Sequence, residues 1–312
     1  MASDSRFLGI DIGGTKTAVS VLSEKEGVIA REWFASGVEP QGDVDEMVRL
    51  GRRLLEQHGQ AVGVGISVGA MFDPRSGCLG AAPHKPAWEG FPIVNAIGEA
   101  FALPVAADND ANACALAEWR YGAGRGFRHL AFLTFGTGLG AGLILNGALY
   151  HGASSLAGEI GALRVASEGP GVRGKPGCLE GYASGAGIAG LAELRRRDWK
   201  GKTAIPGSAT ARDVAVAARS GDALAIEIFR ESGDALGRGL AAMIDLLNLE
   251  VIVLGSIFVR CEDLLRPSME AALRREAMGS ALDDCRIVPA ALGEEIGDHA
   301  ALALAVAGLN QC

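Results

Sequence analysis

The sequence predicts an α/β protein with two domains. Short apolar segments rich in β-branched residues alternate with longer segments of helical periodicity, which is typical of α/β layers. At 312 residues, the chain is longer than one hydrophobic core usually supports, so we expect about two domains. A strand, a Gly-Thr turn and a second strand occur at residues 7–22 and again at 130–145, which indicates two halves built on one plan.

The N-terminal third begins with two strands joined by a glycine turn. Phe7–Ile12 is apolar, and a β-branched, apolar run resumes at Ala18–Leu22. A helical pattern covers Val44–His58, and a strand follows at Ala61–Ser67. The next predicted elements are a helix over Ile93–Ala102, a strand over Leu103–Ala107 and a helix over Ala111–Trp119, with Asn109 at its N-cap.

The rest of the chain holds the second strand pair and most of the helices. Leu130–Phe135 and Gly140–Leu145 are predicted strands on either side of a glycine turn. We also predict helices over Cys178–Leu194, Ala223–Leu247, Leu264–Arg275 and Ala300–Leu309, and strands over Val251–Leu254 and Arg286–Pro289. We expect a small domain of residues 1–109 and 295–312 and a large domain of residues 110–294, with ligand sites at strand ends.

The composition argues against several classes of partner. The 29 Lys and Arg residues against 37 Asp and Glu residues give a net charge of −8, which opposes binding to nucleic acid. The sequence shows no N-terminal signal and no apolar run of about 18 residues without a charge, so we expect a cytoplasmic protein without a membrane partner. The six cysteines form no CxxC pair and are expected to be free thiols.

The first glycine motif is Asp11-Ile-Gly13-Gly14-Thr15-Lys16. A glycine pair between two strands lets backbone N–H groups approach phosphate oxygens, and Thr15 can add a hydroxyl donor. Asp11 can hold a hydrated Mg²⁺ ion beside them. Taken alone, the motif also fits an ordinary glycine hairpin.

A second loop of the same type is Thr134-Phe-Gly-Thr-Gly-Leu-Gly-Ala-Gly142. Two such loops, one from each half, predict a cleft that binds a nucleotide from both sides. Gly136-x-Gly138-x-x-Ala141 also matches a dinucleotide fingerprint, but a strand follows it where that fingerprint needs a helix. Gly65-Ile-Ser67-Val-Gly69 fits a hydrolase nucleophile elbow, but a turn follows, and no Walker A pattern occurs in the sequence.

The candidate general base is Asp110, in Asn109-Asp-Ala-Asn112. A carboxylate at the start of a helix, just after a strand, can accept a proton from a hydroxyl that attacks a γ-phosphoryl group. An aspartate in this position can equally serve the helix N-terminus alone. Glu159 and Glu180 suit hydrogen bonds to sugar hydroxyls, and either can instead be an ion-pair partner.

Together these segments resemble the ROK family (repressor, open reading frame, kinase) of bacterial sugar kinases and regulators. The resemblance runs from the first glycine motif to Val251-Ile-Val-Leu-Gly255 and includes Ala157-Gly-Glu-Ile-Gly161 and Gly177-Cys-Leu-Glu180. It implies the actin and hexokinase-like fold, also called ribonuclease H-like, with two domains around a central cleft. Family regulators carry an N-terminal helix-turn-helix, and only ten residues precede Asp11 here, which argues against a DNA-binding repressor.

The resemblance also implies roles for individual residues, with Asp110 as the base and Asp11 holding Mg²⁺ through water. The implied ATP-binding residues are Gly13, Gly14, Thr15, Lys16, Thr137 and Gly138 at the phosphates, and Gly255 and Ser256 near the adenosine. The implied sugar-binding residues are Gly69, Asn109, Asp110, Glu159 and Glu180, together with His84, which stands where many family kinases have asparagine.

The sequence departs from the family pattern at its zinc site. Zinc-binding members have a histidine three residues beyond the sugar-binding glutamate and three cysteines in a CxCGxxGC run. This chain has Ala162, Gly171 and Arg173 at three of those positions, and only Cys178 remains. One thiolate cannot build a tetrahedral site, so we predict no structural zinc. The loop 169–177 is then held by its own turns or by a partner subunit.

We therefore predict an ATP-dependent kinase that phosphorylates a hexose or an amino sugar with Mg-ATP. We expect a homodimer, since twofold dimers are the commonest oligomers. His84 can supply the donor that Ala162 lacks, or it can be a bland loop histidine. The alternative function is a non-catalytic sugar-sensing protein of the same family without a DNA-binding domain, and polyphosphate is an alternative phosphate donor.

Overall fold

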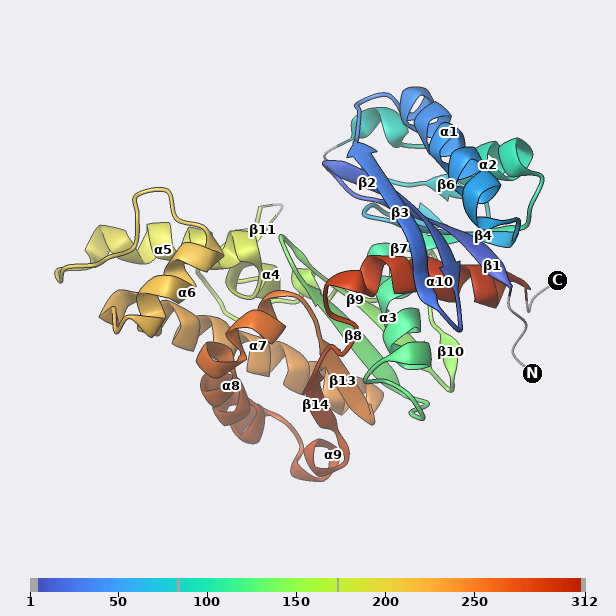
Figure 1. The fold of residues 1–312 in the computed structure, drawn as a ribbon. Coiled ribbons are helices and arrows are strands. Elements are labelled where there is room, and N and C mark those ends of the chain that lie inside the picture. The colour runs from blue at the N-terminus through green and yellow to red at the C-terminus, as the bar shows by residue number, and fades with distance from the viewer. Residues whose placement is uncertain (1–4, 83–84, 173, 310–312) are drawn as a thin grey trace. The chain divides into compact units, whose positions relative to one another are not determined.

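The chain folds into two compact units. The computed structural model describes residues 5–82, 85–172 and 174–309 (Figure 1). Unit 1 consists of Met1–Arg125, Leu149–Ala157 and Leu292–Cys312, and unit 2 consists of Gly126–Ala148 and Gly158–Ala291. Unit 1 therefore continues past residue 109, where the sequence suggested a boundary, because the helix that begins at Asp110 packs against the C-terminal helix of the same unit.

Unit 1 is built on a five-stranded sheet with helices on both faces (Figure 1). Its strand order is β3-β2-β1-β4-β7, in which β1 pairs antiparallel with β2 and parallel with β4. The strands are β1 (Arg6–Ile12), β2 (Lys16–Ser23), β3 (Gly27–Ala35), β4 (Ala61–Val68) and β7 (Val105–Asn109). The helices are α1 (Pro40–His58) and α2 (Ile93–Phe101) on one face, and α3 (Asp110–Tyr121) and α10 (Ile296–Leu309) on the other.

The faces of this sheet follow from the alternation of side chains along β1. Leu8 and Ile10 join the core under α1 and α2, whereas Phe7 packs with Ala301 of α10. Gly65 of β4 lets α10 come close, since a Cβ atom there would lie 1.8 Å from the carbonyl oxygen of Ala301. The close packing of α10 therefore accounts for Gly65 in the Gly65-Ile-Ser67-Val-Gly69 motif, with no need for a catalytic role of Ser67.

Unit 2 repeats the sheet order. Its strands run β10-β9-β8-β13-β14, with β8 antiparallel to β9 and parallel to β13. The strands are β8 (Leu130–Phe135), β9 (Leu139–Leu145), β10 (Ala148–Leu149), β13 (Val251–Leu254) and β14 (Arg286–Pro289). The helices are α4 (Leu179–Tyr182), α5 (Gly185–Asp198), α6 (Ala211–Arg219), α7 (Ala223–Leu247), α8 (Ile257–Glu276) and α9 (Gly279–Asp284). The predicted α/β class and its two similar halves are confirmed.

Short elements complete the chain. They are β5 (Phe72–Asp73), β6 (Cys78–Leu79), β11 (Gly171–Val172) and β12 (Lys175–Pro176), with 3₁₀ turns at Pro86–Trp88, Ile160–Ala162 and Gly293–Glu295. Among the described residues, no helix is both long and apolar enough to span a membrane.

Several predicted boundaries were wrong. The helix expected over Cys178–Leu194 is two helices, because Ser184 is the N-cap of α5 and accepts a hydrogen bond from the N–H of Gly187. The helix expected from Leu264 begins at Ile257, ahead of a kink at Cys261. Strand β3 and helix α6 were missed. The residues of β3 are partly exposed, and α6 has only nine residues, so neither gives a long apolar pattern.

Candidate active site

The first glycine turn closes tightly between β1 and β2. The N–H of Gly13 donates to the carbonyl oxygen of Lys16 at 3.0 Å, and a Cβ atom on Gly13 would lie 2.9 Å from that oxygen. The carbonyl of Thr15 accepts a hydrogen bond from the N–H of Ser36 at 3.0 Å. Gly14, Thr15 and Lys16 are exposed at the tip of the turn. The turn therefore presents backbone to solvent, as a phosphate-binding loop must.

Asp11 lies at the end of β1, directly before this turn. Burial raises the pKa of its carboxyl, a hydrogen bond from Ser67 opposes that effect, and the nearby Asp298 carboxylate adds to it. Asp298 itself lies 3.1 Å from Arg31 and accepts a hydrogen bond from Ser20. A carboxylate whose charge is disfavoured in this way would be stabilised by a divalent cation, and its hard oxygens suit Mg²⁺.

Asp110 lies where β7 ends and α3 begins. The side-chain oxygen of Asn109 caps α3 by accepting from the N–H of Ala111 at 2.9 Å. Burial raises the pKa of Asp110 to about 6, the N–H of Ala111 opposes the shift, and the charge of Asp11 adds to it. Asp110 is therefore mostly ionised at pH 7 and close to the pKa that suits a general base.

Gly69 brings these parts of unit 1 together. Its N–H donates to the carbonyl oxygen of Ile12 at 2.9 Å. A Cβ atom on Gly69 would lie 3.9 Å from both the Asp110 Oδ2 atom and the Gly13 Cα atom. The side-chain amide of Asn109 donates to the carbonyl oxygen of Ala70 at 3.0 Å. The first glycine turn, the Gly69 loop and the Asn109-Asp110 pair thus form one cluster in unit 1.

A pocket in unit 1 adjoins this cluster. Its lining includes Gly13, Gly69 and two residues that sequence reasoning missed, Lys85 and Trp88. The Lys85 ammonium is buried, lies 3.2 Å from a carboxylate oxygen of Asp43 and sits 4.5 Å from the centre of the Trp88 ring. Lys85 stands in a Pro- and Gly-rich loop, where sequence pattern says nothing of burial. His84, the predicted sugar-binding residue next to it, lies outside the described residues.

The second glycine turn, in unit 2, is held by the start of α5. The N–H of Gly136 donates to the carbonyl of Gly138 at 3.1 Å, and the N–H of Gly185 donates to the carbonyl of Gly136 at 2.8 Å. The N–H of Ala186 donates to the carbonyl of Thr137 at 3.1 Å. Thr137 and Gly138 remain exposed, as their counterparts in unit 1 are.

Gly255 and Ser256 follow β13 next to this turn. A Cβ atom on Gly185 would lie 3.1 Å from the Gly136 carbonyl oxygen and 3.2 Å from the Ile257 side chain, so the two segments are neighbours. Ser256 has φ 47° and ψ −106°, a strained backbone for a residue with a side chain, at the start of α8. Strain of this kind is concentrated at ligand sites.

Glu159 and Glu180 differ in their surroundings. Glu180 accepts a hydrogen bond from the N–H of Leu139 at 2.8 Å, and a Cβ atom on Gly138 would lie 3.0 Å from the same carboxylate oxygen. Glu180 therefore braces the second glycine turn. Glu159 is exposed and follows Gly158, whose carbonyl accepts from the N–H of Ala141 at 2.9 Å. Their contact with a sugar stays a prediction.

The described part of the loop 169–177 is held by hydrogen bonds. Strands β11 and β12 pair within it, and the Cys178 thiol donates to the carbonyl of Lys175 at 3.0 Å. The N–H of Gly177 donates to the carbonyl of Pro170 at 3.0 Å. Among residues 5–82, 85–172 and 174–309, no group of three or more His, Cys, Asp or Glu side chains is placed to hold a metal ion.

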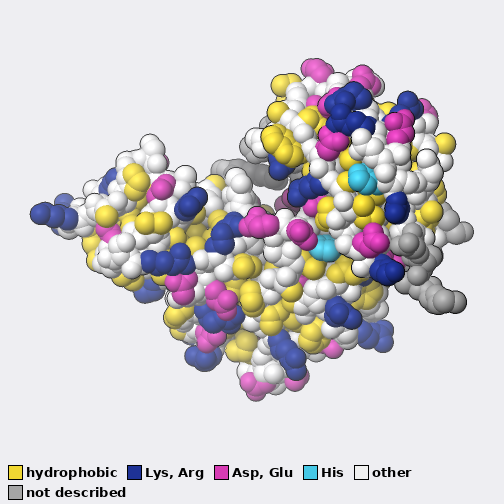
Figure 2. All heavy atoms as spheres, viewed as in Figure 1, with side chains coloured by type: hydrophobic (Ala, Val, Ile, Leu, Met, Phe, Trp, Pro, Cys, Tyr) yellow, Lys and Arg dark blue, Asp and Glu magenta, His cyan; other side chains and the backbone are white. Residues whose placement is uncertain are grey.

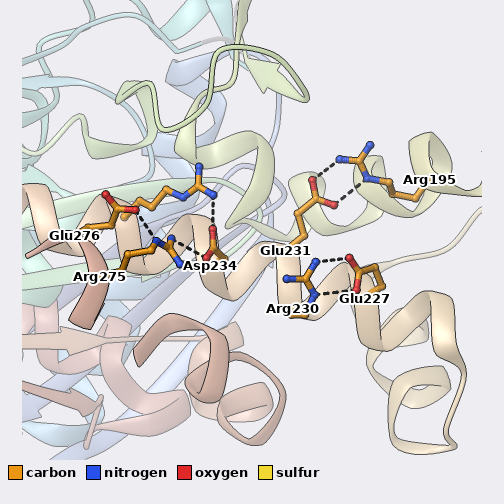
Figure 3. Close-up of a pocket in the computed structure, with 8 residues that line it drawn as sticks. Arg195, Glu227, Arg230, Glu231, Asp234, Arg275 and Glu276 are labelled. Carbon is orange, nitrogen blue, oxygen red and sulfur yellow. Dashed lines mark hydrogen bonds and ion pairs between the residues drawn. The ribbon is translucent and has the colours of Figure 1, made fainter. Parts of the chain in front are cut away.

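A larger pocket lies elsewhere in unit 2, on α7 (Figure 3). Its volume is about 690 Å³. Basic and acidic side chains lie next to one another around α7 and α8 on the face shown in Figure 2. In Figure 3 they are joined in pairs, Arg195 with Glu231, Arg230 with Glu227, and Arg275 with Asp234 and Glu276. The predicted site residues do not line this pocket, and its charges already neutralise one another.

Comparison with known proteins gives the family. A family model described as ROK family matches residues 7–307. A glucokinase of Halalkalibacterium halodurans is 32% identical, over 95% of this chain and 93% of its own length. The crystal structure of a ROK family glucokinase from Streptomyces griseus in complex with glucose and AMPPNP is 29% identical, covers 97% of this chain and 100% of its own, and has a TM-score of 0.80. The structure of a ROK family transcriptional regulator, a homologue of the Escherichia coli Mlc protein, has a TM-score of 0.90 at 22% identity, covering 99% of this chain and 79% of that one, so it shows the shared fold alone.

Proposed function

The chain belongs to the ROK family, and from this premise we propose that it is an ATP-dependent sugar kinase. It would transfer the γ-phosphate of ATP to a hydroxyl of a hexose or an amino sugar. The support is the similarity to glucokinases along nearly the whole chain and the presence of both glycine turns and the candidate base.

The observation that carries the proposal is the cluster of Gly13, Gly69 and Asp110 in unit 1. The Asp110 carboxylate lies beside exposed backbone and has a pKa raised to about 6 by burial. It would accept the proton of the sugar hydroxyl as that oxygen attacks the γ-phosphorus, and ADP would leave with the electrons of the broken P–O bond. Such transfer asks a protein mainly for position and charge.

The other residues would hold the two substrates. Backbone N–H groups of the two glycine turns, with the Thr15 and Thr137 hydroxyls, would bind the phosphates, and Gly255 and Ser256 would lie near the adenosine. Asp11 would hold hydrated Mg²⁺, which neutralises charge on the phosphates when bound. Gly69, His84, Asn109, Glu159 and Glu180 would contact the sugar.

A screen for ADP release tests this function. The purified protein is incubated with Mg-ATP and, separately, with glucose, mannose, fructose, allose and N-acetylated hexosamines. We expect sugar-dependent ADP release with at least one of them. A parallel set with polyphosphate in place of ATP, read by sugar phosphate formation, tests the alternative donor.

The second candidate is a non-catalytic sugar sensor, supported by a xylose repressor of Caldicellulosiruptor bescii that is 28% identical over 80% of this chain and 65% of its own length. Sugar binding measured by calorimetry without ADP release or sugar phosphate formation would support the sensor and contradict the kinase. We also propose that the protein forms a homodimer without structural zinc, to be tested by light scattering and by metal analysis of the purified protein.

A further inference from the structure

Asp108, which precedes Asn109 and the proposed general base Asp110, is a buried carboxylate with three polar contacts. Asp108 is the buried residue of β7, with 3% of its surface exposed. Its Oδ1 atom accepts hydrogen bonds from the N–H of Asn109 at 2.8 Å and from the side-chain amide of Asn112 at 2.9 Å. Its Oδ2 atom lies 2.6 Å from the Nε2 atom of His151. These contacts hold the residues on both sides of Asp110.

His151 comes from a segment that is far away in sequence but belongs to unit 1. The segment Leu149–Ala157 lies between two parts of the chain that belong to unit 2. The N–H of Ala157 donates to the carbonyl of His151 at 3.1 Å, and Arg75 donates to the carbonyl of Ala153 at 3.1 Å. The His151 side chain is 29% exposed, and its hydrogen bond with Asp108 raises its pKa. The imidazole is thus presented to Asp108 by a loop that is itself held.

We propose that His151 is a positioning residue for phosphoryl transfer, acting through Asp108 on the Asn109-Asp110 pair. The inference rests on the proposed kinase function. With His151 in place, both oxygens of Asp108 have partners, and the carboxylate has one orientation. Without His151, Oδ2 loses its partner, and a buried carboxylate that lacks a partner turns or moves toward solvent.

The consequence would reach the base through two hydrogen bonds. Asp108 fixes the backbone N–H of Asn109 and the side chain of Asn112, which belong to the first turn around Asp110. Asn109 in turn caps α3 and binds the carbonyl of Ala70 beside Gly69. A shift of this turn moves the Asp110 carboxylate relative to the acceptor hydroxyl, and a displacement of about 1 Å can lower a rate by about 100-fold.

The variants His151→Ala and His151→Gln test the proposal. Glutamine keeps an N–H donor that can reach Asp108, whereas alanine removes it. We expect His151→Ala to lower kcat by about 10- to 100-fold, with a change of less than about threefold in KM for ATP, and His151→Gln to stay within about fivefold of the wild type. Added imidazole should restore part of the kcat of His151→Ala. His58→Gln, at the end of α1 in the same unit, is the matched control and should leave kcat unchanged.

A merely structural role predicts a different result. In that case His151→Ala would lower the melting temperature and the active fraction but leave kcat per folded molecule unchanged. Imidazole would then restore no activity, and His151→Gln would have the same kcat per folded molecule as His151→Ala. An unchanged kcat in His151→Ala would overturn the proposal.

A second measurement does not depend on turnover. The Asp110 carboxyl is titrated by ¹³C NMR of aspartate-labelled protein, with Asp110→Asn for assignment. We expect its titration midpoint to move in His151→Ala and to stay in His58→Gln. An unmoved midpoint would overturn the positioning role, whether or not the wild type releases ADP. Absence of ADP release in the wild type would contradict the kinase function, and this titration alone would then decide whether His151 positions Asp110.

Discussion

Units 1 and 2 share one sheet order but differ in the charges at their strand ends. In unit 1, Asp11 lies near the end of β1 and Asp110 follows β7, and burial raises the pKa of both carboxyls. In unit 2, β8 and β13 run directly into Gly136 and Gly255. The nearby Glu180 is already hydrogen-bonded to backbone. The same scaffold thus supplies a glycine turn in both units, and buried carboxyls with raised pKa values in unit 1. Under the proposed function, unit 1 would carry out the chemistry and unit 2 would hold a ligand.

The largest effect should come from the base in unit 1. Asp110→Asn keeps the shape but cannot accept the proton, so we expect kcat to fall by about 1,000-fold, while sugar binding measured by calorimetry changes little. In the wild type, kcat/KM should rise with pH through about 6, because only the ionised carboxylate is active and its pKa is raised to that value. Retained turnover in the variant would refute the assignment of Asp110.

The second largest effect should come from the buried ion pair of unit 1. Lys85→Met removes the cation beside the buried Asp43 carboxylate, which keeps the hydrogen bond from the N–H of Gly37 at 2.7 Å. Loss of one partner of a buried pair costs about 3 kcal/mol in the free energy of unfolding. Arg230→Met in unit 2 is the matched control, because Arg230 and Glu227 are 61% and 44% exposed and such pairs contribute less than about 1 kcal/mol. Equal losses in urea unfolding of the two variants would contradict this difference between the units.

These ion pairs also show what the sequence could predict. The glycine turns, the α/β order and the position of Asp110 follow from local patterns, apolar strands around glycines and an N-cap residue before a helix. Lys85 and Asp43 lie 42 residues apart, and His151 and Asp108 lie 43 residues apart. No periodicity links such pairs, because each is set by how loops pack onto the sheet. Likewise, Glu180 looked like a sugar ligand by its motif, and its bond to Leu139 appeared only in the folded chain.

Glu180 gives the third prediction, and the only one for function in unit 2. Glu180→Ala removes a charged acceptor from the N–H of Leu139, next to the second glycine turn. We expect a loss of about 2 kcal/mol in ATP binding, seen as a rise of about 10- to 30-fold in KM for ATP with a smaller change in kcat. If KM rose for the sugar but not for ATP, Glu180 would instead contact the sugar, and the second glycine turn would not depend on its hydrogen bond.

The smallest effect returns to Asp110 and concerns stability. Burial raises its pKa from the ordinary value of 3.8 to about 6, so the folded protein binds this proton more tightly than the unfolded chain does. Its stabilising contribution is therefore present below pH 3.8 and is lost as the pH rises through about 6, which leaves the wild type less stable at pH 7. Asp110→Asn should raise the free energy of unfolding at pH 7 by about 1–2 kcal/mol, allowing for the partial exposure of the residue, and by much less at pH 3.5, where both side chains are neutral. Glu180→Gln in unit 2 should show no such gain, since its carboxylate is stabilised by a backbone donor. If Asp110→Asn melted at or below the wild-type temperature at pH 7, the carboxylate would not be destabilised by folding, and the distinction between a reactive unit 1 and a holding unit 2 would lose its physical basis.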